Sequence, residues 1–314
     1  MPTNLAPAPG RAHRIEVDGL RVHAVEWLPR AGGPGPSGAG DRRILLVHGL
    51  GANTLSWFAL AQGLADRVGA TVTALDLAGH GRTRATTRLA TIESNRDLLV
   101  SFLEQHGPAA IFGNSMGGVL AAGVAARRPD LVDALVLVNP ALQWRGVKSR
   151  DWRRIARFVP VMVPSVGHRV VATRARALGP ARLVDLSLAM SLHDPSRLDP
   201  VLRRRLIHLA AERFAYPEAP QAYADAARTL LRELTDGADT DLGVAATERP
   251  TLLVHGARDR LVAVELAHAA AARHDQVHLR VLDDLGHAPQ LEDPATFLDV
   301  TTGWLDAALV ARRV

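Results

Sequence analysis

The sequence predicts an α/β fold in which a mostly parallel sheet is flanked by helices and carries an inserted helical cap. Short apolar segments alternate with segments of helical periodicity, as expected for strands covered on both faces by helices. This alternation stops after Pro140, gives way to about a hundred helical, Arg-rich residues, and resumes near residue 251. We therefore expect a core of residues 1–140 and 248–314 and a cap of residues 141–247.

The first half of the expected core opens with a hairpin. Residues 14–28 alternate polar and apolar side chains around Asp18-Gly19, which is a strong turn signal between two strands. Residues 31–40 (AGGPGPSGAG) are expected to form a flexible loop. Strands are then predicted at 44–48, 71–77, 109–113 and 134–139, and helices at 55–68, 94–106 and 116–127.

The second half of the core resumes the same alternation after the cap. A strand at 251–255 is followed by a helix at 262–273, a strand at 277–282 and a helix at 294–310. Because parallel strands joined by helices share one sheet, these segments are expected to extend the sheet that the first half begins.

The composition is that of an ordinary globular protein and excludes several function classes. Of 314 residues, 47% are hydrophobic and 22% charged, and there is no cysteine for disulfides, thiolate metal sites or a thiol nucleophile. The net charge of +5 comes from residues 141–249, which hold 18 basic and 12 acidic residues. With 4% aromatic residues and no basic motif, nucleic-acid binding is not expected. Because no apolar signal segment stands at the N-terminus, we expect a cytoplasmic protein.

The segment 113–118 (GNSMGG) lies between an apolar strand and an Ala-rich helix. A sharp strand-to-helix turn at G-x-S-x-G holds the serine in a strained backbone conformation, so Gly113 and Gly117 are needed where side chains would clash. The turn would project Ser115 above the sheet beside a helix N-terminus, whose free N–H groups suit a developing oxyanion. The motif therefore predicts a nucleophile elbow.

With this motif and four others in order, the sequence resembles the α/β-hydrolase family. The loop 48–51 (HGLG) follows the first parallel strand, where the family places an oxyanion-hole N–H, and residues 76–82 (DLAGHGR) resemble a structural loop of the family. Asp259 follows the strand TLLVHG, and His287 lies in the loop LGHAP. The resemblance implies an α/β-hydrolase fold, a Ser115–His287–Asp259 triad, and oxyanion donors at the amides of Leu50 and Met116.

The chemistry agrees with these roles. A serine hydroxyl is a weak nucleophile, so a histidine must take its proton, and a carboxylate must orient that histidine and stabilise its cation. Some relatives place the acid after the strand that precedes the cap, but that position here is Asn139. Asp283 and Asp284 also precede His287, but adjacent acids at a strand end are more often solvated. We therefore favour Asp259.

No metal or cofactor is expected. Residues 48–54 (HGLGANT), followed by Asp76, resemble a dinucleotide fingerprint, but Thr54 occupies the position of its third glycine. No Walker sequence is present, and His268, His274 and His278 lack the spacing of a metal site.

Residues 143–160 (QWRGVKSRDWRRIARFVP) admit three interpretations. Six basic residues accompany two tryptophans, as in a basic amphipathic helix that makes weak contact with an anionic membrane surface. We favour a cap helix that turns its apolar face to the active site and its arginines to water. In the third interpretation, a cap arginine binds a substrate carboxylate.

The expected reaction is hydrolysis of a small-to-medium apolar carboxylic ester through an acyl-enzyme, because serine at the elbow favours acyl chemistry. A second hypothesis uses the same triad to cleave carbon–carbon bonds in vinylogous diketo acids. Related enzymes of that kind tend to carry a longer Gly-rich oxyanion loop and an aromatic residue where this chain has Ala288. Lactonase, thioesterase and perhydrolase activities remain open, and a ligand-binding module on this fold is the non-enzyme alternative.

Overall fold

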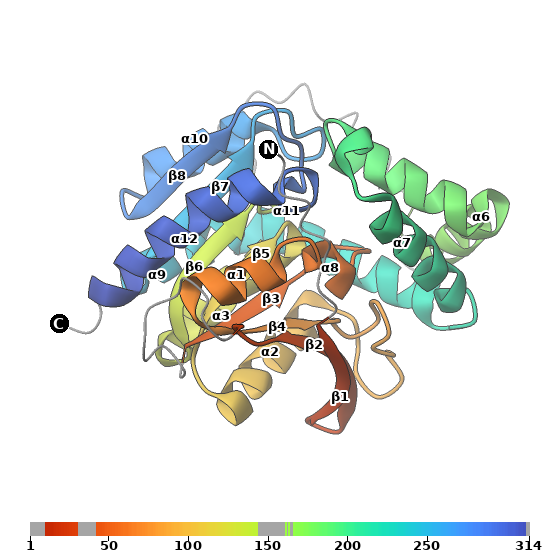
Figure 1. The fold of residues 1–314 in the computed structure, drawn as a ribbon. Helices are drawn as coiled ribbons and strands as arrows, with labels where there is room; N and C mark the ends of the chain where they lie inside the picture. The colour runs from red at the N-terminus through yellow and green to blue at the C-terminus, as the bar shows by residue number, and fades with distance from the viewer. Residues whose placement is uncertain (1–9, 31–41, 144–160, 162, 164–165, 312–314) are drawn as a thin grey trace.

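The computed structural model describes residues 10–30, 42–143, 161, 163 and 166–311. Within these residues, eight strands form one sheet in the order β1-β2-β4-β3-β5-β6-β7-β8 (Figure 1). All neighbouring strands from β4 to β8 in this order are parallel, which confirms the predicted mostly parallel α/β sheet. The strands are β1 (Arg11–Val17), β2 (Leu20–Trp27), β3 (Arg43–Val47), β4 (Thr71–Leu75), β5 (Ala109–Asn114), β6 (Val132–Val138), β7 (Thr251–Gly256) and β8 (Val277–Leu282).

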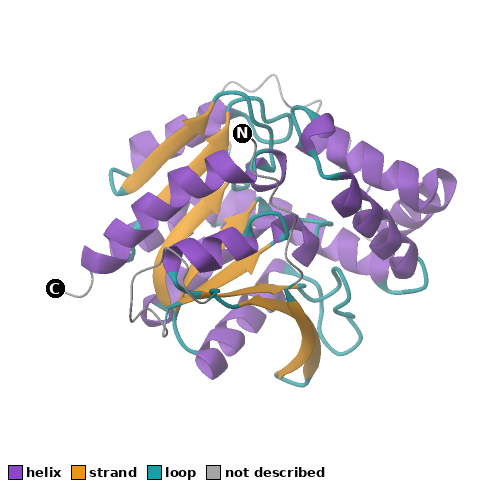
Figure 2. Cartoon of the chain, viewed as in Figure 1, coloured by secondary structure: helices purple, strands orange, loops and turns teal. Residues whose placement is uncertain are grey.

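Helices cover both faces of the sheet (Figure 2). Successive residues of a strand pack into two different hydrophobic cores, one on each face of the sheet. In β3, Leu45 packs with α2, α3 and α10, whereas Leu46 packs with α1 and α12. This double burial explains why the central strands are continuously apolar. The helices of the core are α1 (Ala61–Val68), α2 (Ile92–His106), α3 (Met116–Arg127), α10 (Val264–Arg273), α11 (Pro289–Glu292) and α12 (Pro294–Ala311), with short 3-10 helices η1 (Thr54–Trp57) and η2 (Pro129–Leu131).

The predicted hairpin is confirmed. Strands β1 and β2 are antiparallel, and both residues of the turn, Asp18 and Gly19, have positive φ (47° and 72°). This is the backbone that Asp-Gly favours in a two-residue hairpin. Strand β2 then pairs antiparallel with β4 rather than with β3, the strand that follows it in sequence.

The continuous helix predicted at 55–68 is wrong in its first half. The structure has η1 and α1 instead, because the entry to this segment is held by side chains. Asn53 accepts a hydrogen bond from Leu55 N (3.0 Å), and Thr54 N donates to Asp76 (2.7 Å). These bonds fix a tight turn that a regular α-helix could not satisfy.

In the described part of the segment between β6 and β7 there are four helices, α6 (Gly167–Ser191), α7 (Pro200–Arg213), α8 (Ala219–Asp236) and α9 (Ala238–Glu248), with a short η3 (Pro195–Arg197). Helices α6 and α7 form a layer set apart from the sheet (Figure 1), and α6 is kinked at Gly179 (φ 68°) before Pro180. Leucines of α6 and α7 pack against Leu55 of η1 and Leu291 of α11. In contrast, Leu242 of α9 is part of the core cluster on the sheet.

Two predicted segments lie outside the described residues: the loop 31–40, and 144–160 of the basic segment 143–160. Among the described residues, no helix combines the length and apolarity that a bilayer span requires.

Candidate active site

Ser115 occupies the sharp turn between β5 and α3. Its backbone has φ 55° and ψ −117°, a combination that L-residues adopt rarely. The neighbouring backbone holds this conformation: Ser115 N donates to Val138 O (3.0 Å), and Ser115 O accepts from Gly118 N (2.9 Å) and Ala141 N (3.2 Å). Such strain persists only where the surroundings determine it, and it is frequent at active sites.

The two elbow glycines allow backbone segments to approach closely. A Cβ on Gly113 would lie 2.3 Å from Gly117 O, and a Cβ on Gly117 would lie 2.2 Å from Val47 O. Both contacts are with backbone, which cannot rotate away. The predicted need for glycine at both positions is therefore a packing requirement in this structure.

The loop after β3 lies against the serine. A Cβ on Gly49 would come within 3.1 Å of the Ser115 Cβ, which places the Leu50 amide next to the elbow. No described residue accepts a hydrogen bond from Leu50 N. Met116 is the first residue of α3, where N–H groups have no acceptor within the helix. These two amides are thus available to bind an oxyanion.

Buried side chains hold this loop in place. His48 hydrogen-bonds Gly49 O through Nδ1 (2.8 Å) and accepts from Leu77 N through Nε2 (3.1 Å). Burial lowers the pKa of the His48 ring, consistent with a neutral ring that both donates and accepts. Asp76 accepts from Thr54 N on the far side of the loop (2.7 Å) and pairs with His23 (2.9 Å). The loop is therefore anchored at both ends.

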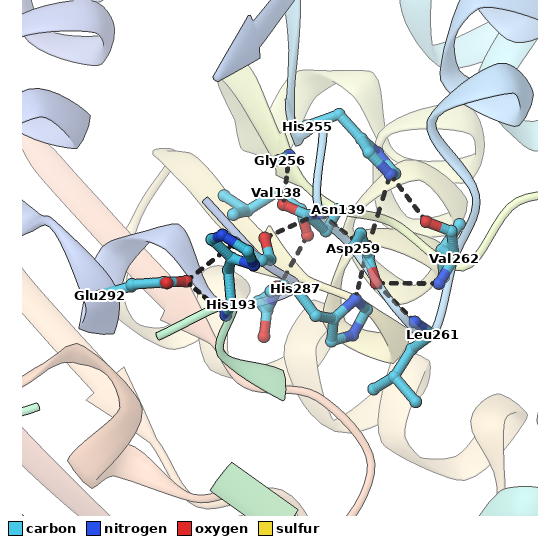
Figure 3. Close-up of polar contacts among 12 residues, drawn as sticks. Val138, Asn139, His193, His255, Gly256, Asp259, Leu261, Val262, His287 and Glu292 are labelled. Carbon is cyan, nitrogen blue, oxygen red and sulfur yellow. Dashed lines mark hydrogen bonds and ion pairs between the residues drawn. The ribbon is translucent and has the colours of Figure 1, made fainter. Parts of the chain in front are cut away.

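His287 and Asp259 are in contact (Figure 3). His287 Nδ1 lies 2.7 Å from Asp259 Oδ2, and both residues are buried. Asp259 follows β7 and His287 follows β8, so two adjacent parallel strands deliver the pair to one edge of the sheet. Asp283 and Asp284 are exposed, and the Asp284 side chain faces Arg258 at 3.9 Å. The structure therefore joins Asp259, and not its two sequence rivals, to the histidine.

Asp259 is held as a carboxylate. Its Oδ1 accepts from Leu261 N (2.7 Å) and Val262 N (3.0 Å). Burial alone would raise the pKa of Asp259, but the charge and hydrogen bond of His287, the charge of His255 and the Val262 N–H outweigh it and lower the pKa to about 2. An ionised carboxylate at this position fixes the His287 tautomer with its proton on Nδ1, leaving Nε2 to accept a proton.

A hydrogen bond links the histidine loop to the elbow. Asn114, the residue before the serine, donates through Nδ2 to His287 O (3.1 Å) and to Val138 O (3.0 Å). The hydrogen bonds among the described residues do not include one between Ser115 Oγ and the His287 ring. Because catalytic hydrogen bonds are often long before substrate binds, the geometry is compatible with Ser115 as the partner of His287, and its contacts stop at the Asn114 bond to the histidine loop.

Asn139 supports the acid, a role that its sequence context did not predict. This residue is fully buried with φ 42°, and its Nδ2 donates to Asp259 Oδ2 (2.8 Å) while its Oδ1 accepts from Gly256 N (3.3 Å). Asn139 and His287 thus bind the same oxygen of the Asp259 carboxylate, Oδ2 (Figure 3). Its place at the end of β6, where some relatives carry the acid, was the available signal.

The fold and this constellation define an α/β-hydrolase, and comparison with known proteins agrees. A profile of the alpha/beta hydrolase fold family matches residues 42–294, so the chain belongs to that family. A pimeloyl-[acyl-carrier protein] methyl ester esterase of Neisseria meningitidis serogroup B is 30% identical over 271 residues, covering 85% of this chain and 94% of the esterase.

Two solved structures have similar folds. A membrane phospholipase A described as a bacterial virulence factor superposes with a TM-score of 0.72 at 25% identity, covering 96% of this chain and 87% of the phospholipase. The 2-hydroxy-6-oxo-6-phenylhexa-2,4-dienoate hydrolase of Rhodococcus sp. strain RHA1 superposes with a TM-score of 0.70 at 20% identity, covering 95% and 99%. The proteins of similar sequence or fold therefore include an esterase, a phospholipase and a dienoate hydrolase, and the family match and the esterase relative make the chain a hydrolase of this fold.

Proposed function

We propose that this protein is a serine hydrolase that cleaves carboxylic esters of small-to-medium apolar substrates. The observation that carries the proposal is the buried His287–Asp259 pair, 2.7 Å apart, whose loop is hydrogen-bonded to the residue preceding the strained Ser115. Serine at the elbow suits acyl transfer, and ester hydrolysis is the activity of the esterase relative.

In the proposed reaction, His287 Nε2 takes the hydroxyl proton as Ser115 Oγ bonds to the ester carbonyl carbon. The carbonyl oxygen becomes an oxyanion that the Leu50 and Met116 amides stabilise. Collapse of this intermediate breaks the carbon–oxygen bond, and the leaving alcohol takes the proton from His287. Water then attacks the acyl-enzyme by the same sequence, which releases the carboxylic acid and restores Ser115.

The helices α6–α9 are the proposed cap. Leucines of α6 and α7 pack on η1 and α11, which flank the oxyanion loop and the histidine loop respectively. Tyr223 of α8 lies over the oxyanion loop, since a Cβ on Gly51 would come within 2.9 Å of its ring. A substrate bound between this layer and the sheet would meet apolar walls, which favours an apolar acyl or alcohol group.

A p-nitrophenyl ester series from acetate to dodecanoate tests the proposal, with Ser115→Ala as the control. We expect a wild-type optimum at one chain length and loss of nearly all turnover in the variant. Turnover that survives Ser115→Ala at every length would overturn the serine mechanism. Serine-dependent turnover of vinylogous diketo acids, without ester turnover, would instead favour carbon–carbon cleavage.

A further inference from the structure

Glu292 binds two distant segments with one carboxylate. It lies at the end of α11, beside His193 (Figure 3), is 3% exposed, and accepts three backbone hydrogen bonds. Gly286 N donates to Oε2 (2.8 Å), His193 N donates to Oε2 (3.0 Å) and Asp194 N donates to Oε1 (2.6 Å). Gly286 immediately precedes His287, and His193 follows the end of α6. One side chain therefore joins the histidine loop to the proposed cap.

A second set of contacts reinforces this junction. Ser191, the last residue of α6, accepts hydrogen bonds from His287 N (2.7 Å) and Ala288 N (3.2 Å). A Cβ on Gly286 would lie 2.6 Å from His193 N and 2.7 Å from Ser191 O, so the two backbones are in direct contact. The backbone N–H groups of residues 286–288 thus all donate to Glu292 or to Ser191. These hydrogen bonds together fix the position of the His287 backbone.

The carboxylate has no cationic partner among the described residues, so its charge is balanced by these N–H groups. Hydrogen bonds to an ionised acceptor are stronger than neutral ones. A glutamine at this position would offer one acceptor oxygen and one NH₂ group, and the latter would oppose a backbone N–H. The site therefore requires an acceptor-only side chain.

We propose that Glu292 is a positioning residue, which holds His287 in register with Ser115 and ties the end of α6 to the catalytic histidine. It acts through His287 and does not touch the reacting atoms. This inference rests on the proposed function, since it assigns Glu292 a part in the same reaction. It also makes the position of α6 a determinant of the rate of serine attack.

The test compares Glu292→Gln with Asp293→Asn in the full chain. Asp293 is a matched control because its carboxylate binds Thr296 in α12 and not the histidine loop. For Glu292→Gln we expect kcat on the best p-nitrophenyl ester to fall about 10- to 100-fold, as for a small misplacement of a catalytic group, with KM within about threefold of wild type. Asp293→Asn should stay within about twofold.

A double-variant cycle separates positioning from a general structural role. In the His287→Ala background, Glu292→Gln should cause no further loss of residual kcat, because the group through which it acts is already absent. The rate constant for labelling by a fluorophosphonate should fall in Glu292→Gln by the same factor as kcat, since that reaction also needs His287 as base. Equal kcat in Glu292→Gln and Asp293→Asn would overturn the proposal. So would a result in which Glu292→Gln lowers kcat by the same factor in the His287→Ala background as in wild type.

Two further measurements keep the result interpretable. If Glu292→Gln does not fold, Glu292→Asp takes its place in the same cycle. Aspartate keeps the negative charge but is shorter by one methylene, so we again expect kcat to fall in the wild-type background and not in the His287→Ala background. Ser115→Ala is measured in parallel: if it retains wild-type turnover, the proposed function fails, whereas loss of turnover in Ser115→Ala with full activity in Glu292→Gln rejects only the role of Glu292.

Discussion

At the scale of single residues, the elbow combines a strained backbone with close packing of backbone against backbone. Ser115 has a strained backbone, and the glycines on either side leave no room for a side chain because the obstacles are backbone atoms of the neighbouring strand and helix. Strain of this kind costs about 1–3 kcal/mol. The surrounding hydrogen bonds must offset that cost, so small changes here should affect folding and activity together.

Gly117→Ala tests this constraint. Its Cβ would meet Val47 O at 2.2 Å, so we expect the free energy of unfolding to fall by about 2–4 kcal/mol and turnover to be lost. Gly303→Ala is the control, because it lies in α12 with nothing within 4 Å of the new Cβ. That change should raise stability by up to about 1 kcal/mol. Urea unfolding of both variants checks the pair, and equal stabilities would contradict the packing argument.

Asp259→Asn tests the choice of acid. The amide keeps the shape of the side chain but favours the wrong tautomer of His287, so kcat should fall by up to ~10⁴-fold with KM little changed. Asp284→Asn, at an exposed position close before His287 in the sequence, should leave kcat within about twofold. A larger loss in Asp284→Asn than in Asp259→Asn would show that the acid has been assigned wrongly.

At the scale of elements, the strand–helix alternation was predictable because burial on both faces makes the strands apolar along their length. The placement of β2 beside β4 was not, since strand order depends on contacts between segments distant in sequence. The break between η1 and α1 was missed for a similar reason: Asp76, 22 residues away, caps the turn. Of the site, the motif residues could be found from local sequence. The position of Asn139 after β6 pointed to the site but not to its contact with Asp259, and no local pattern records the contacts of Glu292.

The attachment of α7 to the core depends on a partly buried arginine. Arg213 donates to Gly81 O (2.7 Å) and Gly79 O (2.8 Å), whereas Arg203 of the same helix forms an exposed pair with Asp185. Arg213→Met should lower the free energy of unfolding by about 2–3 kcal/mol because it leaves two carbonyls without a donor. Arg203→Met should cost about 0–1 kcal/mol. Urea denaturation of the two variants compares them, and similar costs would contradict the assigned role.

At the scale of the whole molecule, buried histidines make stability depend on pH. Burial, together with the nearby charges of His48 and Arg213, lowers the pKa of His80 to about 3. Between pH 6.5 and 3 the unfolded chain binds a proton at His80 that the folded chain does not, so stability falls as pH falls through this window. Burial lowers the pKa of His48 and His255 as well, which adds to the same trend.

His80→Asn isolates one of these contributions. Asparagine can keep the hydrogen bond that the ring makes to Ala78 O (3.1 Å) without titrating. Between pH 4.5 and 6, the slope of unfolding free energy against pH should be smaller in His80→Asn by up to about 1.4 kcal/mol per pH unit. Urea unfolding across this range measures both slopes, and identical slopes would mean that His80 titrates normally in the folded protein.

Covalent labelling is the sharpest test of whether Ser115 is the nucleophile of a hydrolase. Wild-type protein is treated with a fluorophosphonate, digested and mapped by mass spectrometry, with Ser115→Ala treated in parallel. We predict a single adduct on the peptide that contains Ser115, formed in wild type and absent from the variant. An adduct on another residue, or equal labelling of the two proteins, would contradict the account.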